Sequence, residues 1–148
     1  MSEATARAAV VVNAPPKAVW KALTDPELIR QYFMGATVST DWKEGSPITF
    51  SGDFKGKSYE DKGEVLAVRP HKELRYSHWS PLSGTADAPE NYHVVDIELT
   101  EADAATEVTL TQSNLSGEVT DADRASRDEY TKNWNAVLEG LKKVVERN

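Results

Sequence analysis

The clearest pattern of apolar and polar positions lies in the C-terminal part of the chain. Apolar side chains recur there at the spacing of one helix face, and polar side chains occupy the other face. Thr120-Asp121-Ala122-Asp123 precedes this stretch and resembles a capping box. The pattern predicts an amphipathic helix of about seven turns, whose apolar stripe contains Tyr130, Trp134, Val137, Leu138, Leu141, Val144 and Val145.

The N-terminal part predicts one strand and two short helices. Residues 5–13 contain a short β-branched run that is followed by Pro15 and Pro16. A proline is tolerated in the first turn of a helix, so a helix from Pro16 is expected. Asp25-Pro26 ends this helix and starts the next, with Asp25 as the cap.

The middle of the chain predicts a meander of strands. Apolar and polar residues alternate between turn-forming residues in six segments, 37–42, 48–54, 59–68, 73–79, 92–100 and 106–114. Short turns between consecutive strands favour antiparallel pairing. The prediction is a single α+β domain over residues 1–148. A curved antiparallel sheet of about six to seven strands wraps around the long C-terminal helix, and two short helices follow the first strand.

Composition narrows the range of partners. The chain has 17 Lys and Arg against 24 Asp and Glu, a formal net charge of −7, which argues against binding nucleic acid. It has no cysteine, so disulfides and thiolate sites are excluded. Residues 1–9 do not resemble a signal peptide, and no segment has the length of a membrane span. We therefore expect a cytoplasmic protein that forms a monomer or a homodimer.

Three strands predict where a ligand could bind. If 73–79, 92–100 and 106–114 are antiparallel neighbours, one end of their inward face is polar and contains His78, His93, Gln112 and Asn114. The other end is apolar and contains Leu74, Ile97, Leu99, Val108 and Leu110. An apolar inner end with a few polar groups at the opening is typical of a small-molecule pocket.

Other interpretations of these residues remain open. Polar strand ends often meet solvent without any function. A metal site at the two histidines lacks an evident third ligand, and Asp96 and Glu98 lie on the opposite strand face. Neither histidine has an obvious carboxylate to orient it, so a catalytic role has no visible support. Trp134 is interpreted first as a core residue of the long helix. No cofactor is expected.

Several segments carry a resemblance to a known family. They include residues 15–27, 31–33, 63–65 with Pro70, 74–79 and 133–142. Through them the chain resembles the START-like superfamily (SRPBCC, Bet v 1-like), and more narrowly the Activator of Hsp90 ATPase homologue 1-like family. The resemblance implies a helix-grip fold around a hydrophobic cavity. It departs from many relatives at Tyr32 and Asn133, which affects the subfamily and not the fold.

Three functions follow as hypotheses. The first is binding of a small hydrophobic or amphipathic molecule, whose polar end meets Tyr76, His78, His93, Gln112 and Asn114, with Trp134 in the wall. The second, implied by the resemblance, is a domain that contacts an Hsp90-type chaperone. The third is an enzyme similar to polyketide cyclases and aromatases, with His78 or His93 as the acid or base.

Overall fold

The computed structural model describes residues 4–33, 35–54, 56–81, 85–117 and 119–147. Two short helices, α1 (Pro16–Thr24) and α2 (Pro26–Tyr32), follow the first strand, and the long helix α3 (Asp121–Arg147) ends the fold. The strands are β1 (Ala4–Val12), β2 (Thr37–Ser39), β3 (Pro47–Phe54), β4 (Lys57–Arg69), β5 (Glu73–His78), β6 (His93–Ala102) and β7 (Ala105–Asn114).

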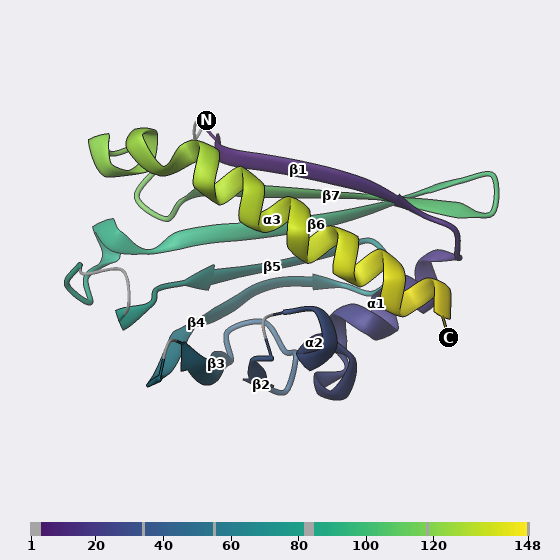
Figure 1. The fold of residues 1–148 in the computed structure, drawn as a ribbon, viewed down its shortest axis with the longest axis horizontal. Coiled ribbons are helices and arrows are strands. Elements are labelled where there is room, and N and C mark those ends of the chain that lie inside the picture. The colour runs from purple at the N-terminus through teal and green to yellow at the C-terminus, as the bar shows by residue number, and fades with distance from the viewer. Residues whose placement is uncertain (1–3, 34, 55, 82–84, 118, 148) are drawn as a thin grey trace.

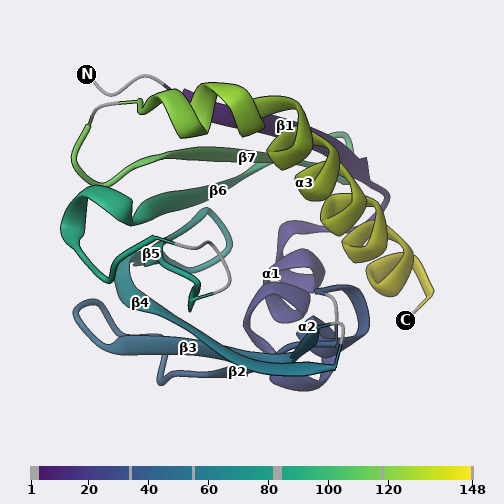
Figure 2. The same cartoon turned by 60° about the vertical axis from the view of Figure 1, so that its left-hand side comes forward.

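The seven strands form one antiparallel sheet in the order β1-β7-β6-β5-β4-β3-β2. β4 joins two parts of it, because residues 57–64 pair with β3 and residues 65–69 pair with β5. Figures 1 and 2 show α3 crossing the concave side of this curved sheet, with α1 and α2 near the end of α3. The structure therefore confirms the predicted helix-grip architecture.

The helix boundaries follow from local chemistry. Pro16 stands in the first turn of α1, and the Asp25 side chain caps α2 by accepting a hydrogen bond from the Glu27 amide at 3.0 Å. At the start of α3 the Asp123 amide donates to Thr120 Oγ1 and the Thr120 amide donates to Asp123 Oδ2, both at 3.1 Å. This reciprocal pair is a capping box, with aspartate in place of the usual glutamate.

The core lies between the second half of α3 and the inner face of the sheet. Val137, Leu138, Leu141, Val144 and Val145 are all buried on this helix. Gly140 lets α2 approach α3 closely, since a Cβ there would lie 2.9 Å from the Cβ of Tyr32. The tyrosine hydroxyl donates to the Ala22 carbonyl at 2.8 Å, which ties α1 and α2 together beneath α3.

Two segments differ from the sequence prediction. The strand expected over 37–42 ends at Ser39, and Trp42 has a φ of 60°, which turns the chain out of the sheet. The loop expected over 80–90 ends in a short 3₁₀ helix, Pro89–Asn91, and residues 82–84 of it lie outside the described part. No helix in the described ranges is long and apolar enough to cross a membrane.

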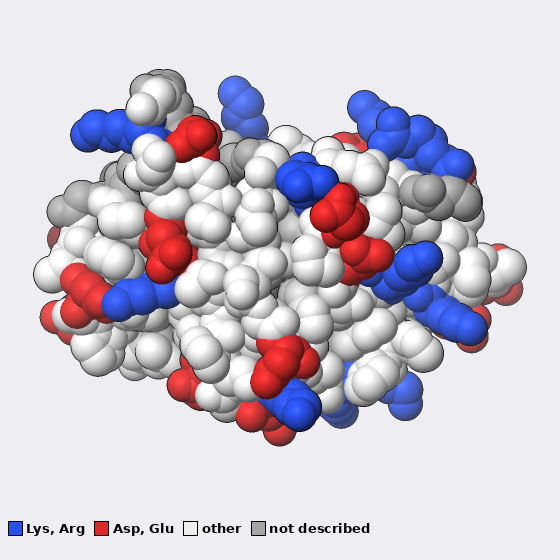
Figure 3. Space-filling view, turned by 90° about the horizontal axis from the view of Figure 1, so that it is seen from below, with Lys and Arg blue, Asp and Glu red and all other residues white. Residues whose placement is uncertain are grey.

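Charged side chains are mixed on the surface. On the face shown in Figure 3, basic and acidic side chains alternate over most of the surface, and several basic side chains lie together at the upper right.

Candidate functional site

A cavity of about 380 Å³ lies between the first half of α3 and strands β4 to β7. This volume falls near the lower end of the range of roughly 300–1,000 Å³ that is typical of small-molecule sites. Its apolar and aromatic wall comes from α3, from β6 and from the segments after α2 and β5, and consists of Phe33, Trp79, Val95, Tyr130, Trp134 and Val137.

The polar part of the lining comes from strands β4 to β7, from described residues between β5 and β6, and from α3 with the residue before it. The strand pairings bring its members together, because His78 is paired with His93 and Val95 with Gln112. The charged and amide-bearing members are Asp61, His78, Glu90, Asn91, His93, Gln112, Asp123 and Asn133. The hydroxyl-bearing members are Ser80, Thr85, Thr120 and Ser126.

Asp123 is the centre of one hydrogen-bond network in this wall. Its Oδ1 lies 2.8 Å from His93 Nε2, and its Oδ2 accepts from Asn114 Nδ2 at 2.6 Å. Its side chain is only 5% exposed. Burial opposes ionisation, but the hydrogen bonds from Asn114, His93 and Thr120 outweigh it and lower the pKa of Asp123 to about 2. The group is therefore a fixed carboxylate that orients the imidazole.

A second histidine and carboxylate form a similar pair on the neighbouring strands. His78 Nε2 of β5 lies 2.9 Å from Asp61 Oδ2 of β4, and both side chains are largely buried. The imidazole also packs edge-on against Phe50, with the ring centroids 5.9 Å apart. The other carboxylate oxygen, Oδ1 of Asp61, is buried and has no hydrogen-bond partner among the described residues.

The inner end of the cavity is apolar. Phe33 stacks on Phe50 with centroids 5.4 Å apart and meets the Trp134 ring edge-on at 5.9 Å. The Trp134 Nε1–H donates to Gln112 Oε1 at 2.6 Å, so the partly buried indole and the buried amide oxygen satisfy each other. Trp134 also lines a second cavity of about 30 Å³ beneath the first, together with Tyr76. Burial raises the pKa of the Tyr76 phenol, which therefore stays neutral there.

The sequence-predicted residues are distributed over this wall as follows. His78, His93, Gln112 and Trp134 line the larger cavity. Asn114 lies behind the lining, buried against Asp123, and Tyr76 lines only the smaller cavity. Trp134 is partly buried and packs against the core as well as lining both cavities, so its two interpretations are not exclusive. Ligand contact by any of the six stays a prediction.

The expectation that neither histidine has a carboxylate orienter is wrong. Each ring has one, Asp61 for His78 and Asp123 for His93. The signal for Asp123 was present in the sequence, because the capping box places it at the start of α3. The signal for Asp61 was strand alternation, which puts it on the same face of β4 as the buried Val65. An imidazole held by a carboxylate can donate or accept a proton at a ligand.

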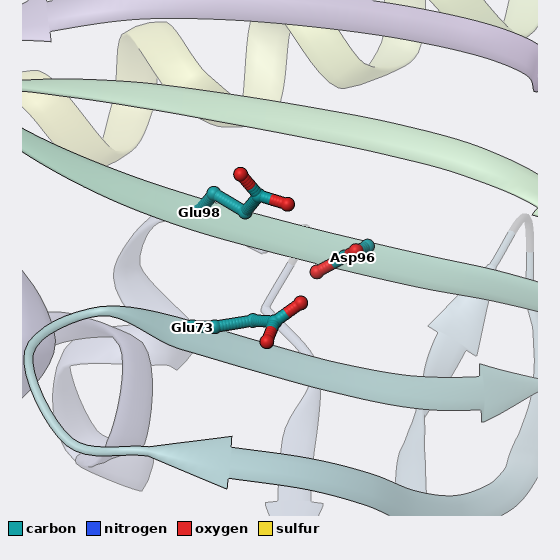
Figure 4. Close-up of side chains that lie close together, drawn as sticks. All are labelled: Glu73, Asp96 and Glu98. Carbon is teal, nitrogen blue, oxygen red and sulfur yellow. The ribbon is translucent and has the colours of Figure 1, made fainter.

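A cluster of three carboxylates lies on the outer face of the sheet. Figure 4 shows Glu73 of β5 beside Asp96 and Glu98 of β6, with their carboxylates directed toward one another. Oxygen atoms of the three lie within 4.8 Å of one another. Arg75 Nη2 contacts Asp96 at 2.9 Å and Glu73 at 3.2 Å, so an arginine already supplies the positive charge. No other group of three possible metal ligands occurs in the described ranges, and the two histidines belong to none.

Comparisons with known proteins place this geometry in context. A family model described as Activator of Hsp90 ATPase homolog 1-like protein matches residues 13–146. The solution structure of ChR145 from Cytophaga hutchinsonii is 48% identical, with a TM-score of 0.78, over 96% of this chain and 93% of that one. Among curated proteins, none matches the chain.

Two further structures share the fold. DynU16, a putative protein in the dynemicin biosynthetic locus, is 25% identical with a TM-score of 0.75, and the match covers 95% of this chain and 46% of that one. Ara h 8.0201 is 13% identical with a TM-score of 0.71, over 96% and 97% of the two chains. At 13% identity the second likeness concerns the fold alone.

Proposed function

This chain belongs to the Activator of Hsp90 ATPase homologue 1-like family within the START-like superfamily, and we propose that it binds a small amphipathic molecule in the cavity beneath α3. The helix-grip fold is typical of ligand-binding domains of that superfamily. The observation that carries the proposal is the cavity of about 380 Å³, which has an apolar inner end and a polar outer end.

The proposed ligand lies with its apolar part against Phe33, Val95 and Trp134. Its polar part then meets the side chains of His78 and His93 near the mouth. Asn114 acts through Asp123 as a positioning residue, because it lies behind the lining and holds the carboxylate that orients His93. Burying the apolar part of a ligand contributes roughly 25 cal/mol per Å² of surface removed from water.

Filling the cavity tests the proposal directly. Ser126 lies on α3 in the lining and is partly exposed, whereas its neighbour Ala125 is exposed to solvent. Ser126→Trp places a large side chain in the cavity, and Ala125→Trp is the matched control outside it. A neutral fluorescent apolar probe such as N-phenyl-1-naphthylamine should bind the wild type and Ala125→Trp, and Ser126→Trp should lose at least tenfold in affinity. Equal binding by both variants would contradict the proposal.

The two oriented histidines favour acid–base chemistry as a second candidate function. His93 with Asp123, and His78 with Asp61, resemble pairs in which a carboxylate orients an imidazole for proton transfer. This geometry supports an enzyme of the cyclase kind more than the sequence alone did. His93→Gln should abolish turnover of a cyclising polyketide substrate and weaken its binding only severalfold, because glutamine keeps a hydrogen-bonding group at this position. Unchanged turnover would remove His93 from that role. Contact with an Hsp90-type chaperone stays a prediction that only the family name supports.

A further inference from the structure

Acidic residues outnumber lysine and arginine among the described residues that line the cavity. Three carboxylates, Asp61, Glu90 and Asp123, contribute to the lining, and no lysine or arginine of the described residues does. Two imidazoles, those of His78 and His93, are the only basic groups among the described residues of this wall. Even with both imidazoles protonated, three negative charges face two positive ones, so the polar end of the cavity keeps a negative charge.

The protein compensates these carboxylates only in part. Asp123 has three hydrogen-bond donors, but Oδ1 of Asp61 is buried without a partner among the described residues. A buried carboxylate oxygen without a donor is costly, and because this atom is closed to water, a cation in the cavity relieves that cost only through the attraction between the two charges. Glu90 is exposed on the short 3₁₀ helix at the mouth, where it adds a third negative charge.

Lys62 lies near the cavity but does not change this balance. The Lys62 ammonium lies 5.8 Å from the centroid of the Trp79 ring, but it forms an ion pair with Asp87 and is not part of the lining. Asp87 also accepts a hydrogen bond from the Tyr92 hydroxyl at 2.6 Å. The charge of Lys62 is therefore already neutralised by a carboxylate outside the cavity.

Aromatic rings add a second feature that suits a cation. Trp79, Tyr130 and Trp134 contribute to the lining, and Tyr130 packs edge-on against His93 with the centroids 5.6 Å apart. The faces of tryptophan and tyrosine rings attract ammonium groups, and more strongly where water is excluded. An ammonium group has three donors and no acceptor, which matches a wall rich in carboxylate oxygens.

We propose that the ligand is an amphipathic amine, whose ammonium group lies at the mouth among Asp61, Glu90 and Asp123 and whose apolar part fills the inner end. This inference rests on the proposed function, since it names the chemical class of the ligand in the same cavity. The inference excludes fatty acids and other anionic amphiphiles as preferred ligands, because their negative charge would be added to those of the three carboxylates, with no lysine or arginine among the described lining residues to offset it.

Three probes that share one apolar chain separate charge recognition from apolar binding. Decylamine, 1-decanol and decanoate are titrated at neutral pH, below their micelle-forming concentrations, and binding is followed by calorimetry and by tryptophan fluorescence. We expect decylamine to bind at least tenfold more tightly than decanoate, with decanol between them. Raising the salt concentration should weaken the binding of decylamine and leave that of decanol unchanged.

A matched pair of variants tests where the ammonium group lies. Glu90→Gln removes the exposed carboxylate at the mouth, and Glu101→Gln removes an exposed carboxylate at the far end of β6. Glu90→Gln should weaken decylamine binding severalfold and leave decanol binding unchanged, whereas Glu101→Gln should change neither.

The outcomes distinguish this inference from the proposed function. Equal affinity for decylamine and decanol, or tighter binding of decanoate, overturns the cationic ligand but leaves a cavity that binds amphiphiles. An equal effect of Glu90→Gln and Glu101→Gln overturns the placement of the ammonium group at the mouth. No binding of any of the three probes contradicts the proposed function itself, and the inference with it.

Discussion

Gly63 lies where β4 passes from its pairing with β3 to its pairing with β5, and replacing it with alanine tests how closely the two strands approach there. A Cβ at this position would stand 1.7 Å from the carbonyl oxygen of Ser77, whereas real Cβ atoms essentially never come within 3.0 Å of another heavy atom. The obstacle is backbone of β5, which cannot rotate away as a side chain would. Gly63→Ala therefore requires a displacement of more than 1 Å between the strands.

The cost can be worked from the hydrogen bonds at this crossing. Lys62 and Trp79 exchange two backbone hydrogen bonds of 3.0 and 2.8 Å, and the Glu64 amide donates to Ser77 Oγ at 2.9 Å. Each such bond contributes about 1 kcal/mol net, so losing the three costs about 3 kcal/mol. That is a large fraction of the 5–15 kcal/mol that is typical for a domain. The same displacement would separate Asp61 from His78 in the cavity wall.

Urea unfolding, followed by tryptophan fluorescence and circular dichroism, measures this loss. Gly52→Ala is the matched control, because the three atoms nearest to a Cβ there all belong to the side chain of Tyr59, with the hydroxyl oxygen nearest at 3.0 Å, and a side chain can move where backbone cannot. We expect Gly63→Ala to lose about 3 kcal/mol of unfolding free energy and Gly52→Ala to lose less than about 1 kcal/mol. If the two variants lie within about 1 kcal/mol of each other, the close approach of β4 and β5 is refuted.

Two predictions concern pH. The pKa of Asp123 is about 2 in the folded protein, whereas that of an ordinary aspartate is near 4. Above pH 4 the ionised carboxylate therefore contributes about 2 kcal/mol to the free energy of unfolding, and this contribution is lost as the pH falls toward 2. The free energy of unfolding that Asp123→Asn loses relative to the wild type, measured with urea, should therefore become smaller below pH 4. A loss that is the same at every pH would contradict this prediction. Burial and the neighbouring Glu73 raise the pKa of Asp96 from its ordinary value near 4 to about 6, so its ionisation lowers stability progressively as the pH rises from about 4 to 6, and the loss is constant above that range. The Tm difference between Asp96→Asn and the wild type should therefore favour the variant more at pH 8 than at pH 4, by a few degrees, and a pH-independent difference would contradict this prediction.

The fold could be predicted from the sequence because most of its helices and strands have clear signals in the local sequence. Asp25-Pro26 divides the two short helices, and the apolar stripe of α3 recurs from Tyr130 to Val145, over about four turns. Residues where tertiary contacts override the local pattern were harder to predict. The strand expected over 37–42 stops at Ser39, and three residues later Trp42 adopts a left-handed φ, a conformation that is uncommon for a bulky side chain and has no signal in the sequence.

The candidate site could be predicted only as far as strand alternation reaches. Alternation and antiparallel order correctly put His78, His93 and Gln112 at one end of the inner face. They could not connect His93 with Asp123, which lies 30 residues later on another element. That contact depends on how the start of α3 docks against β6 and β7. A capping residue can therefore also serve as the partner of a histidine.

The same docking explains why a cavity remains under an otherwise well-packed helix. The second half of α3 is fixed by buried Leu138, Leu141 and Val145, and its first turn is tied to β6 and β7 through Asp123. The middle of the helix then spans a curved sheet between two attachment points, so the space beneath Tyr130 and Trp134 need not close. Because protein partners already hold His93, Gln112 and Trp134, a ligand would find the wall preorganised, which lowers the entropic cost of binding.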